Sequence, residues 1–229
     1  MKTTFTKVAV ATVLAGTTLF GGVASAATKE EVKATDRYAA LKNGMTIEQA
    51  AKVIYGKDYK KQVTTKNGSE VLKLKEEMKY TEDGQKTIVY GLYNRQSYVP
   101  ADVTALMFTT KKKDSVYRLT LKQIDLFRDT KSGYRESTRQ LVKGKKFSKG
   151  MNEKQVDAIL TGSGLGEWSS LNAVDMTFVQ PKKEVDAGFG IKVTLKTYVF
   201  KTSTSQRKLV SFVYDTKKKM YVIESTKTL

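Results

Sequence analysis

The chain has 229 residues, with 41 Lys and Arg against 23 Asp and Glu, no Cys and no His, and a formal net charge of +18. Without Cys it forms no disulfides, and without Cys and His it lacks the usual ligands of zinc and the usual base of a serine or cysteine nucleophile. We therefore predict no metal, no cofactor and no catalytic residue, although carboxylate or lysine chemistry stays open.

The first 26 residues have the three parts of a secretory signal peptide. Lys2 and Lys7 form the positive part, residues 8–20 are mainly apolar, and residues 24–26 (Ala-Ser-Ala) supply the small-residue cleavage pattern. The apolar run is shorter than the roughly 20 residues that span a bilayer. We therefore expect residues 1–26 to be removed and the mature chain to have no membrane span. The protein would then be secreted or associated with the cell wall; an uncleaved N-terminal anchor is the alternative.

Two helices are predicted next, the first over Lys29–Ala40 and the second after Thr46. Thr46 is a good N-cap residue, and Gln49 stands three positions later, which is the spacing of a capping box. Apolar residues at positions 50, 53 and 54 form one face of this short helix. Gly56 can adopt the left-handed conformation that ends it. Gln49 is therefore predicted to be structural.

The pattern then changes to the alternation that is typical of half-buried strands. Residues 72–80 alternate between apolar and polar, and Asp83-Gly84 is a strong turn signal. Further strands are predicted over residues 87–93, 103–108 and 116–121.

A second copy of the Gly-Met segment follows at a fixed offset. Residues 41–56 align with residues 147–162, and the apolar positions of the helix are kept. Asn152 and Gln155 repeat the spacing of the capping box, so Gln155 is also predicted to be structural. The identical pairs are Gly44 and Gly150, Met45 and Met151, Gln49 and Gln155, and Gly56 and Gly162. Residues 108–113 align with residues 214–219 at the same offset. Agreement at one offset indicates two units of similar length.

The second unit repeats the order of the first, with strands predicted over residues 174–179, 192–200, 209–214 and 220–224. The fold class is therefore predicted as α+β, with two tandem modules that each have a helix pair followed by a four-stranded antiparallel sheet. We assign residues 27–128 to the first module and 147–229 to the second. Residues 129–146 are polar and charged, and we assign them to a linker that is partly helical.

The Gly-Met segment resembles the repeat of the β-lactamase inhibitory protein family, which is BLIP-like. It is also similar to the repeat of small outer-membrane assembly lipoproteins of related fold. The shared pattern is an aromatic residue or Leu, Gly-Met, a Gln, an apolar pair and a closing Gly. The resemblance implies that the mature chain binds a protein partner through a concave sheet surface. It also implies contact loops over residues 94–101 and 201–208, with Asp102 where the inhibitory acid of the family lies.

Aromatic side chains on the predicted strands are candidates for such a surface, because aromatic anchors often dominate binding energy. Packing between sheet and helices is the alternative for each of them, and we expect Trp168 to fill a core or an interface. The candidate partner-binding residues are Tyr90, Tyr93, Tyr98, Asp102, Tyr198 and Phe200.

The positive charge indicates a second kind of partner. Outside the cell, anionic wall polymers, anionic lipid headgroups or an acidic protein are expected to be attracted, whereas nucleic acid is not. Two lysine triplets in equivalent turns are the candidate polyanion contacts, and plain solubility is the alternative. These residues are Lys111, Lys112, Lys113, Lys217, Lys218 and Lys219.

An enzyme is the third hypothesis, with Glu76 and Glu77, or Glu82 and Asp83, as possible carboxylate pairs. Neighbouring residues on a strand point to opposite faces, so neither pair converges easily on one substrate. The sequence also has no phosphate loop, zinc signature or nucleophile elbow. We therefore favour an exported, non-catalytic protein-binding function, with binding to an anionic wall polymer as the alternative.

Overall fold

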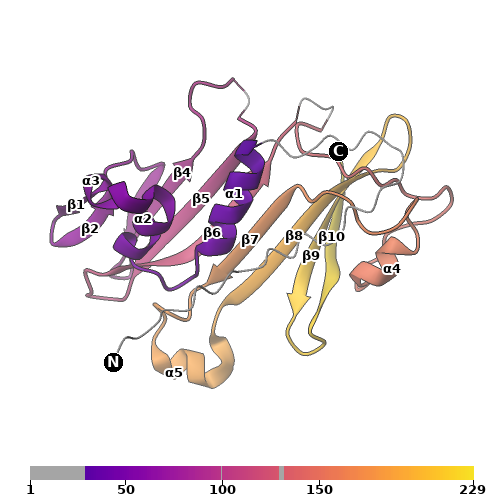
Figure 1. The fold of residues 1–229 in the computed structure, drawn as a ribbon. Helices are drawn as coiled ribbons and strands as arrows, with labels where there is room; N and C mark the ends of the chain where they lie inside the picture. The colour runs from indigo at the N-terminus through magenta and orange to yellow at the C-terminus, as the bar shows by residue number, and fades with distance from the viewer. Residues whose placement is uncertain (1–28, 99, 129–131) are drawn as a thin grey trace, which may run out of the picture.

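The main element of the protein is one eight-stranded antiparallel sheet. The structure is a computed structural model, and it describes residues 29–98, 100–128 and 132–229. The strands lie in the order β10-β9-β8-β7-β6-β5-β4-β3 (Figure 1). Their bounds are β3 (Met78–Glu82), β4 (Gln85–Leu92), β5 (Asp102–Thr110), β6 (Tyr117–Leu126), β7 (Ser170–Asp175), β8 (Lys192–Lys201), β9 (Arg207–Asp215) and β10 (Met220–Thr228). A separate hairpin of β1 (Val63–Lys66) and β2 (Ser69–Leu72) forms a second sheet. The predicted signal peptide, residues 1–26, lies outside the described residues.

The helices are mostly short and lie largely in the first half of the chain. They are α1 (Lys29–Ala40), α2 (Ile47–Tyr55), a 3-10 turn (Gly56–Asp58), α3 (Tyr59–Gln62), α4 (Glu153–Asp157) and α5 (Lys182–Glu184), which continues as a wide turn over Val185–Phe189. The predicted helix over Lys29–Ala40 is confirmed, and it ends at Ala40 as expected. Within the part of the chain that is described, no helix has the length and apolar character needed to cross a bilayer.

The predicted α+β arrangement of two tandem modules, each a helix pair followed by a four-stranded antiparallel sheet, is wrong. β6 and β7 pair directly over five residue pairs, from Leu121 with Val174 to Asp125 with Ser170, so the strands form one continuous sheet. This pairing satisfies backbone groups that a free edge of β6 would leave without partners. Residues 132–229 also contain no helix pair like that of the first half, because α4 has five residues and α5 has three. The described part of the predicted linker, residues 132–146, contains isolated bridges and turns instead of a helix.

The two predicted capping boxes are confirmed. At the start of α2, the Gln49 backbone N–H donates to Thr46 Oγ1 at 3.3 Å, and the Thr46 N–H donates to Gln49 Oε1 at 2.9 Å. At the start of α4, Asn152 and Gln155 exchange the same two bonds, each at 2.9 Å. Gln49 and Gln155 are therefore structural, as predicted.

Each Gly-Met segment is fixed to a strand of the main sheet. The Gly44 N–H donates to the Leu119 carbonyl, and the Leu119 N–H donates to the Met45 carbonyl, both at 2.8 Å. Ile223 on β10 makes the same two bonds with the second segment, also at 2.8 Å. Gly44 has φ +89, a conformation that favours glycine, and this tight link positions α2 on the sheet.

Most predicted strands are present. The alternation over residues 72–80 does not form one strand, because β2 ends at Leu72 and β3 begins at Met78. The strand predicted over residues 174–179 is also wrong. The strand at this place is β7, which lies earlier in the chain and ends at Asp175. The Asp175 carboxylate accepts a hydrogen bond from the Thr177 backbone N–H at 3.1 Å, which is a local turn that stops the strand. The predicted hairpin turn at Asp83-Gly84 is confirmed, since both residues have positive φ.

The apolar core lies on one face of the sheet, beneath the helices. In the first half, α2 packs its buried residues against alternate residues of β4, β5 and β6. In the second half, Val156 of α4 packs with Phe212 and Ile223. α1 lies over the centre, where Ala34 contacts Ile124 and Leu126. We call this side of the sheet the helix face.

Charged groups also fix α1 to the helix face. Glu31 is 1% exposed, and its carboxylate lies 2.6 Å from the Arg128 guanidinium and 3.0 Å from that of Arg135. At the other end of the helix, the Lys122 amine donates to the carbonyls of Tyr38 and Leu41 at 2.8 and 2.7 Å. Burial, together with the nearby positive charge of Lys42, lowers the pKa of Lys122 to about 8.

Candidate binding surface

The opposite side of the sheet carries a row of apolar side chains, and it lies away from α1, α2 and α4. The pairing registers place six residues side by side across β3 to β8, one on each strand. They are Met78, Val89, Met107, Leu121, Val174 and Val193. We call these six residues the apolar row and this side of the sheet the open face.

The pairing registers and the alternation along each strand assign the apolar row to the open face. In β6 a register shift leaves Thr120 as an extra residue, so Leu121 pairs with Met107 and lies on the side opposite to Leu119. Leu106 and Phe108 are fully buried under α2, whereas Met107 between them is only partly buried. Successive strand residues point to opposite sides, so Met107 must face away from the helices. Met78 on the edge strand is 56% exposed. The other five residues of the row are partly buried. The row is therefore a partly exposed apolar stripe, and apolar surface of this kind can mark a place where another molecule binds.

A second row lies beside the first and has a polar centre. Ala105, Gln123, Asn172, Leu195 and Val213 follow one another in register. The Asn172 side-chain amide donates to Gln123 Oε1 at 2.9 Å, and Gln123 Nε2 donates to Asp125 Oδ2 at 2.7 Å. This chain of hydrogen bonds crosses the joint between β6 and β7, and it gives the open face fixed polar groups that could select a partner.

One end of the open face is covered by the loop that follows β7. Val179 of this loop is buried, and its carbonyl accepts a hydrogen bond from Gln85 Nε2 at 3.0 Å. Thr87, Thr109 and Thr120 are buried in the sheet nearby, and their hydroxyls form a hydrogen-bonded series at 3.2 and 3.1 Å. The uncovered part of the face therefore begins at the apolar row.

Three of the predicted aromatic contacts lie in the cores. Tyr90 is fully buried on the helix face, where its hydroxyl accepts a hydrogen bond from the Leu72 N–H at 3.1 Å. Tyr198 and Phe200 are buried on the same face and stack with ring centroids 5.6 Å apart. Burial raises the pKa of both tyrosines above its ordinary value. In this structure these side chains hold the helices on the sheet and are not on a surface.

The other three predicted contacts lie at the opposite end of the sheet from the loop that follows β7. Tyr98 is fully exposed in the loop between β4 and β5, and Tyr93 stacks under the Arg95 guanidinium at 4.6 Å. Asp102 is on the helix face, 3.3 Å from the Arg37 guanidinium. The structure does not bring these residues together with Tyr90, Tyr198 and Phe200 on one exposed surface.

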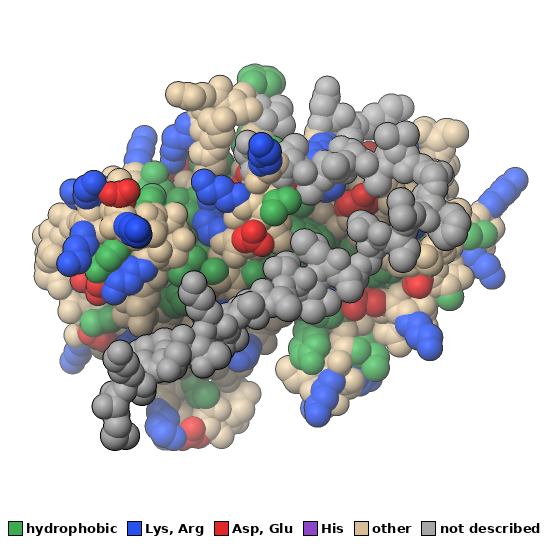
Figure 2. Space-filling view, in the orientation of Figure 1, with side chains coloured by type: hydrophobic (Ala, Val, Ile, Leu, Met, Phe, Trp, Pro, Cys, Tyr) green, Lys and Arg blue, Asp and Glu red, His purple; other side chains and the backbone are tan. Residues whose placement is uncertain are grey.

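The lysine triplets lie at one end of the sheet. β5 and β9 run in the same direction, so the β5–β6 turn with Lys111–Lys113 and the β9–β10 turn with Lys217–Lys219 share that end (Figure 1). Lys113 and Lys219 both have positive φ, at 62 and 53, so the two turns have similar ends. We call these six residues the lysine rim. Elsewhere Lys and Arg are spread over the face that carries α1 and α2 (Figure 2).

Sequence reasoning missed the apolar row, although its alternation is visible in the strands. The signal that could have found it is the match between Val89 and Met107, which alternate with the core residues of their strands. Leu121 follows Leu119 at the spacing of one face, and it joins the row only through the bulge at Thr120. Alternation separates two faces, but it does not tell which face the helices cover.

In the described residues, no three His, Cys, Asp or Glu side chains gather as possible metal ligands. No protein-family model, curated protein or solved structure matches the chain.

Proposed function

We propose that this protein is exported and binds a partner protein through the open face, without catalysing a reaction. The apolar row is the observation that carries the proposal. Strands lie about 4.8 Å apart, so a row across six strands is about 24 Å long. That length fits the standard interface of about 800 Å² per partner. The signal-like residues 1–26 support export, and the resemblance of the Gly-Met segments to BLIP-like proteins supports a protein as the partner.

The carboxylate pairs are already engaged or widely exposed, which supports a non-catalytic function. Glu77 lies 2.6 Å from the Arg95 guanidinium, and Glu76 lies 3.6 Å from the Lys66 amine. Glu82 and Asp83 are exposed at the tip of the β3–β4 hairpin, with no described wall around them. A carboxylate that acts as acid or base is expected in a cleft that perturbs its pKa.

The test compares two substitutions on one strand. Met78→Lys adds a charge to the open face, and Thr81→Lys adds the same charge to the opposite face of β3, where the side chain is also exposed. Tagged protein is crosslinked on cells that export it, and its partners are identified by mass spectrometry. We expect one protein to be captured by the parent chain and Thr81→Lys but not by Met78→Lys.

A third variant, Leu121→Lys, places the charge at the centre of the apolar row and should also lose the partner. Its unfolding curve must stay cooperative for the loss to count. Equal capture by all variants, or no protein captured by the parent chain, would show that the open face is not the binding surface.

The lysine rim favours a second candidate function, which is binding to an anionic wall polymer. Its two triplets are separated along the sheet but share one end, so an extended polyanion could contact both. Replacing Lys217, Lys218 and Lys219 by Gln should reduce sedimentation with purified walls at low salt. Replacing Lys57, Lys60 and Lys61 by Gln removes the same charge elsewhere and is the control. Retention that does not weaken with salt, or equal loss in both triple variants, would rule out the rim.

A further inference from the structure

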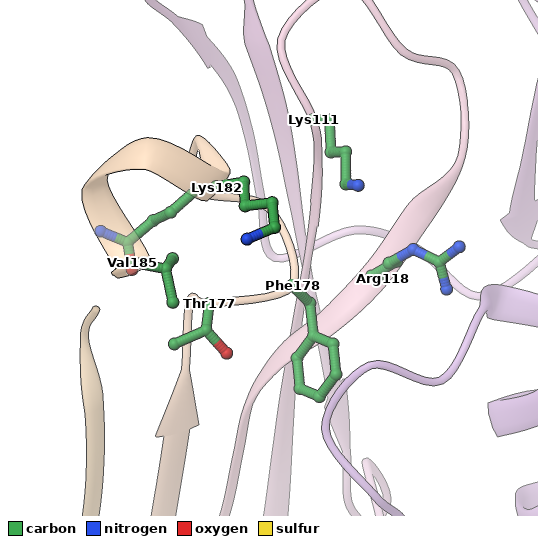
Figure 3. Close-up of a pocket in the computed structure, with 7 residues that line it drawn as sticks. Lys111, Arg118, Thr177, Phe178, Lys182 and Val185 are labelled. Carbon is green, nitrogen blue, oxygen red and sulfur yellow. The ribbon is translucent and has the colours of Figure 1, made fainter. Parts of the chain in front are cut away.

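A pocket of about 410 Å³ lies beside the lysine rim, between the loop that follows β7 and the β5–β6 hairpin. Three cationic side chains line it, Lys111 at the end of β5, Arg118 on β6 and Lys182 on α5. Figure 3 shows Lys111 and Lys182 reaching into the same space from two sides, with the Phe178 ring at its base. None of the residues that are described as lining it is acidic.

The loop that forms one wall is held in place by its own hydrogen bonds. Gln180 Oε1 accepts from the Ile191 N–H at 2.8 Å, and Gln180 Nε2 donates to the Phe189 carbonyl at 3.2 Å. The Phe178 ring lies so close to Gly44 that a Cβ there would be 2.7 Å from it. These contacts hold the wall of the pocket in one conformation, which lowers the entropic cost of binding.

The neutral polar groups of the pocket already have partners. Both ends of the Gln180 amide are bonded within the loop, and the Thr177 hydroxyl donates to Asp175. The remaining donors of the lining are the cations. Arg118 Nη1 donates to the Gly44 carbonyl at 3.2 Å, which holds the guanidinium on the sheet. A neutral ligand would find few partners here, whereas an anion would find the positive charge of Lys111 and Lys182, with the Arg118 guanidinium farther to one side (Figure 3).

The ion pairs around the pocket leave this charge largely uncompensated. Lys182 pairs with Asp186 one turn later, but both side chains are mostly exposed, at 86% and 59%. Such a pair contributes little, so an incoming anion can replace the carboxylate. Lys111 has no carboxylate within 4 Å among the described residues.

We propose that this pocket binds a phosphate group. Lysines act as point charges that meet phosphate oxygens from different directions, whereas a carboxylate prefers the flat, two-pronged contact of a single Arg. The phosphate could belong to a small phosphomonoester or to a phosphodiester polymer that passes along the lysine rim. This inference goes beyond the protein-binding function, because the pocket lies at the end of the sheet and does not include the apolar row.

The experiment measures binding of glycerol 3-phosphate by calorimetry, with acetate as the competing anion. Lys111→Gln with Lys182→Gln removes two cations from the pocket. Lys112→Gln with Lys183→Gln removes the same charge from neighbouring residues that do not line it, and is the matched control. A hydrogen bond to a charged group contributes about 1.5–3 kcal/mol, so we expect the pocket pair to weaken binding at least about tenfold. The control pair should change it less than about twofold.

Several outcomes would overturn the proposal. They are equal weakening in both double variants, acetate binding as tight as phosphate, or no heat from phosphate at concentrations of several millimolar. A glycerol phosphate oligomer distinguishes the two sources, since a polymer ligand should bind more tightly than the monomer and lose that gain when Lys217–Lys219 are replaced by Gln. Met78→Lys should leave phosphate binding unchanged, so a failure of the open face and a failure of the pocket are seen separately.

Discussion

The buried carboxylate of Glu31 provides the sharpest test of how α1 is held on the sheet. Glu31→Gln removes the negative charge that faces the guanidinium groups of Arg128 and Arg135, whose side chains are 22% and 9% exposed. Removal of one partner from a buried ion pair costs about 3–5 kcal/mol, because the opposite charge is left in a low-dielectric site. For a chain of this size, that corresponds to a decrease in melting temperature of roughly 6–20 °C.

The assay is urea unfolding followed by the fluorescence of Trp168, the single Trp of the chain. Trp168 packs against the cluster of Ala34, Ile124 and Leu126 under α1, so it reports on the region that the substitution disturbs. The matched control is Glu224→Gln, which breaks an ion pair of the same 2.6 Å length with Lys149 on an exposed surface. We expect the control to cost less than about 1 kcal/mol. Equal losses in the two variants would refute the reasoning, because they would show that burial of the pair does not matter.

Two further predictions concern the helix face. Burial depresses the pKa of Lys122 from 10.5 to about 8, so above that pH the unfolded chain binds more protons and stability should rise, by at most about 1.4 kcal/mol per pH unit. Buried tyrosines with raised pKa lower the stability as the pH rises near 10, so unfolding is measured between about pH 8 and 9.5. In this range Lys122→Met should abolish the rise in stability. An unchanged rise in the variant would mean that another group causes it. Gly44→Ala should destabilise more than Gly150→Ala in thermal melts, because both residues have positive φ but only the first lacks room for a Cβ; equal losses would mean that the neighbouring ring moves aside.

The local structure could be predicted from the sequence wherever one residue type decides the geometry. Thr46 with Gln49, and Asn152 with Gln155, form capping boxes because their side chains match the free N–H groups of a first helical turn. Asp83 adopts a positive φ before Gly84, as the hairpin turn requires. These signals act within four residues of chain, so no knowledge of the rest of the fold is needed.

The overall arrangement could not be predicted, because it depends on contacts between distant residues. The similarity of residues 41–56 and 147–162 favoured two equal modules, yet α4 ends after five residues, whereas α2 has nine. The sequences of β6 and β7 also do not predict whether the two strands pair with each other or face solvent. The same holds for the candidate site, since Tyr90 and Met107 are both apolar strand residues. Only the position of the helices places Tyr90 in the core and Met107 on the open face.

The continuity of the sheet has a consequence for binding. Leu121 and Val174 are neighbours in register on β6 and β7, so the apolar row crosses the joint between the two halves without a break. Separate sheets would have divided this row into two short stripes, each too small for a stable interface. The hydrogen bonds from Asn172 to Gln123, and from Gln123 to Asp125, fix the side chains at the same joint. A partner on the open face would therefore contact both halves at once, and its binding would oppose any bending of the sheet at β6 and β7.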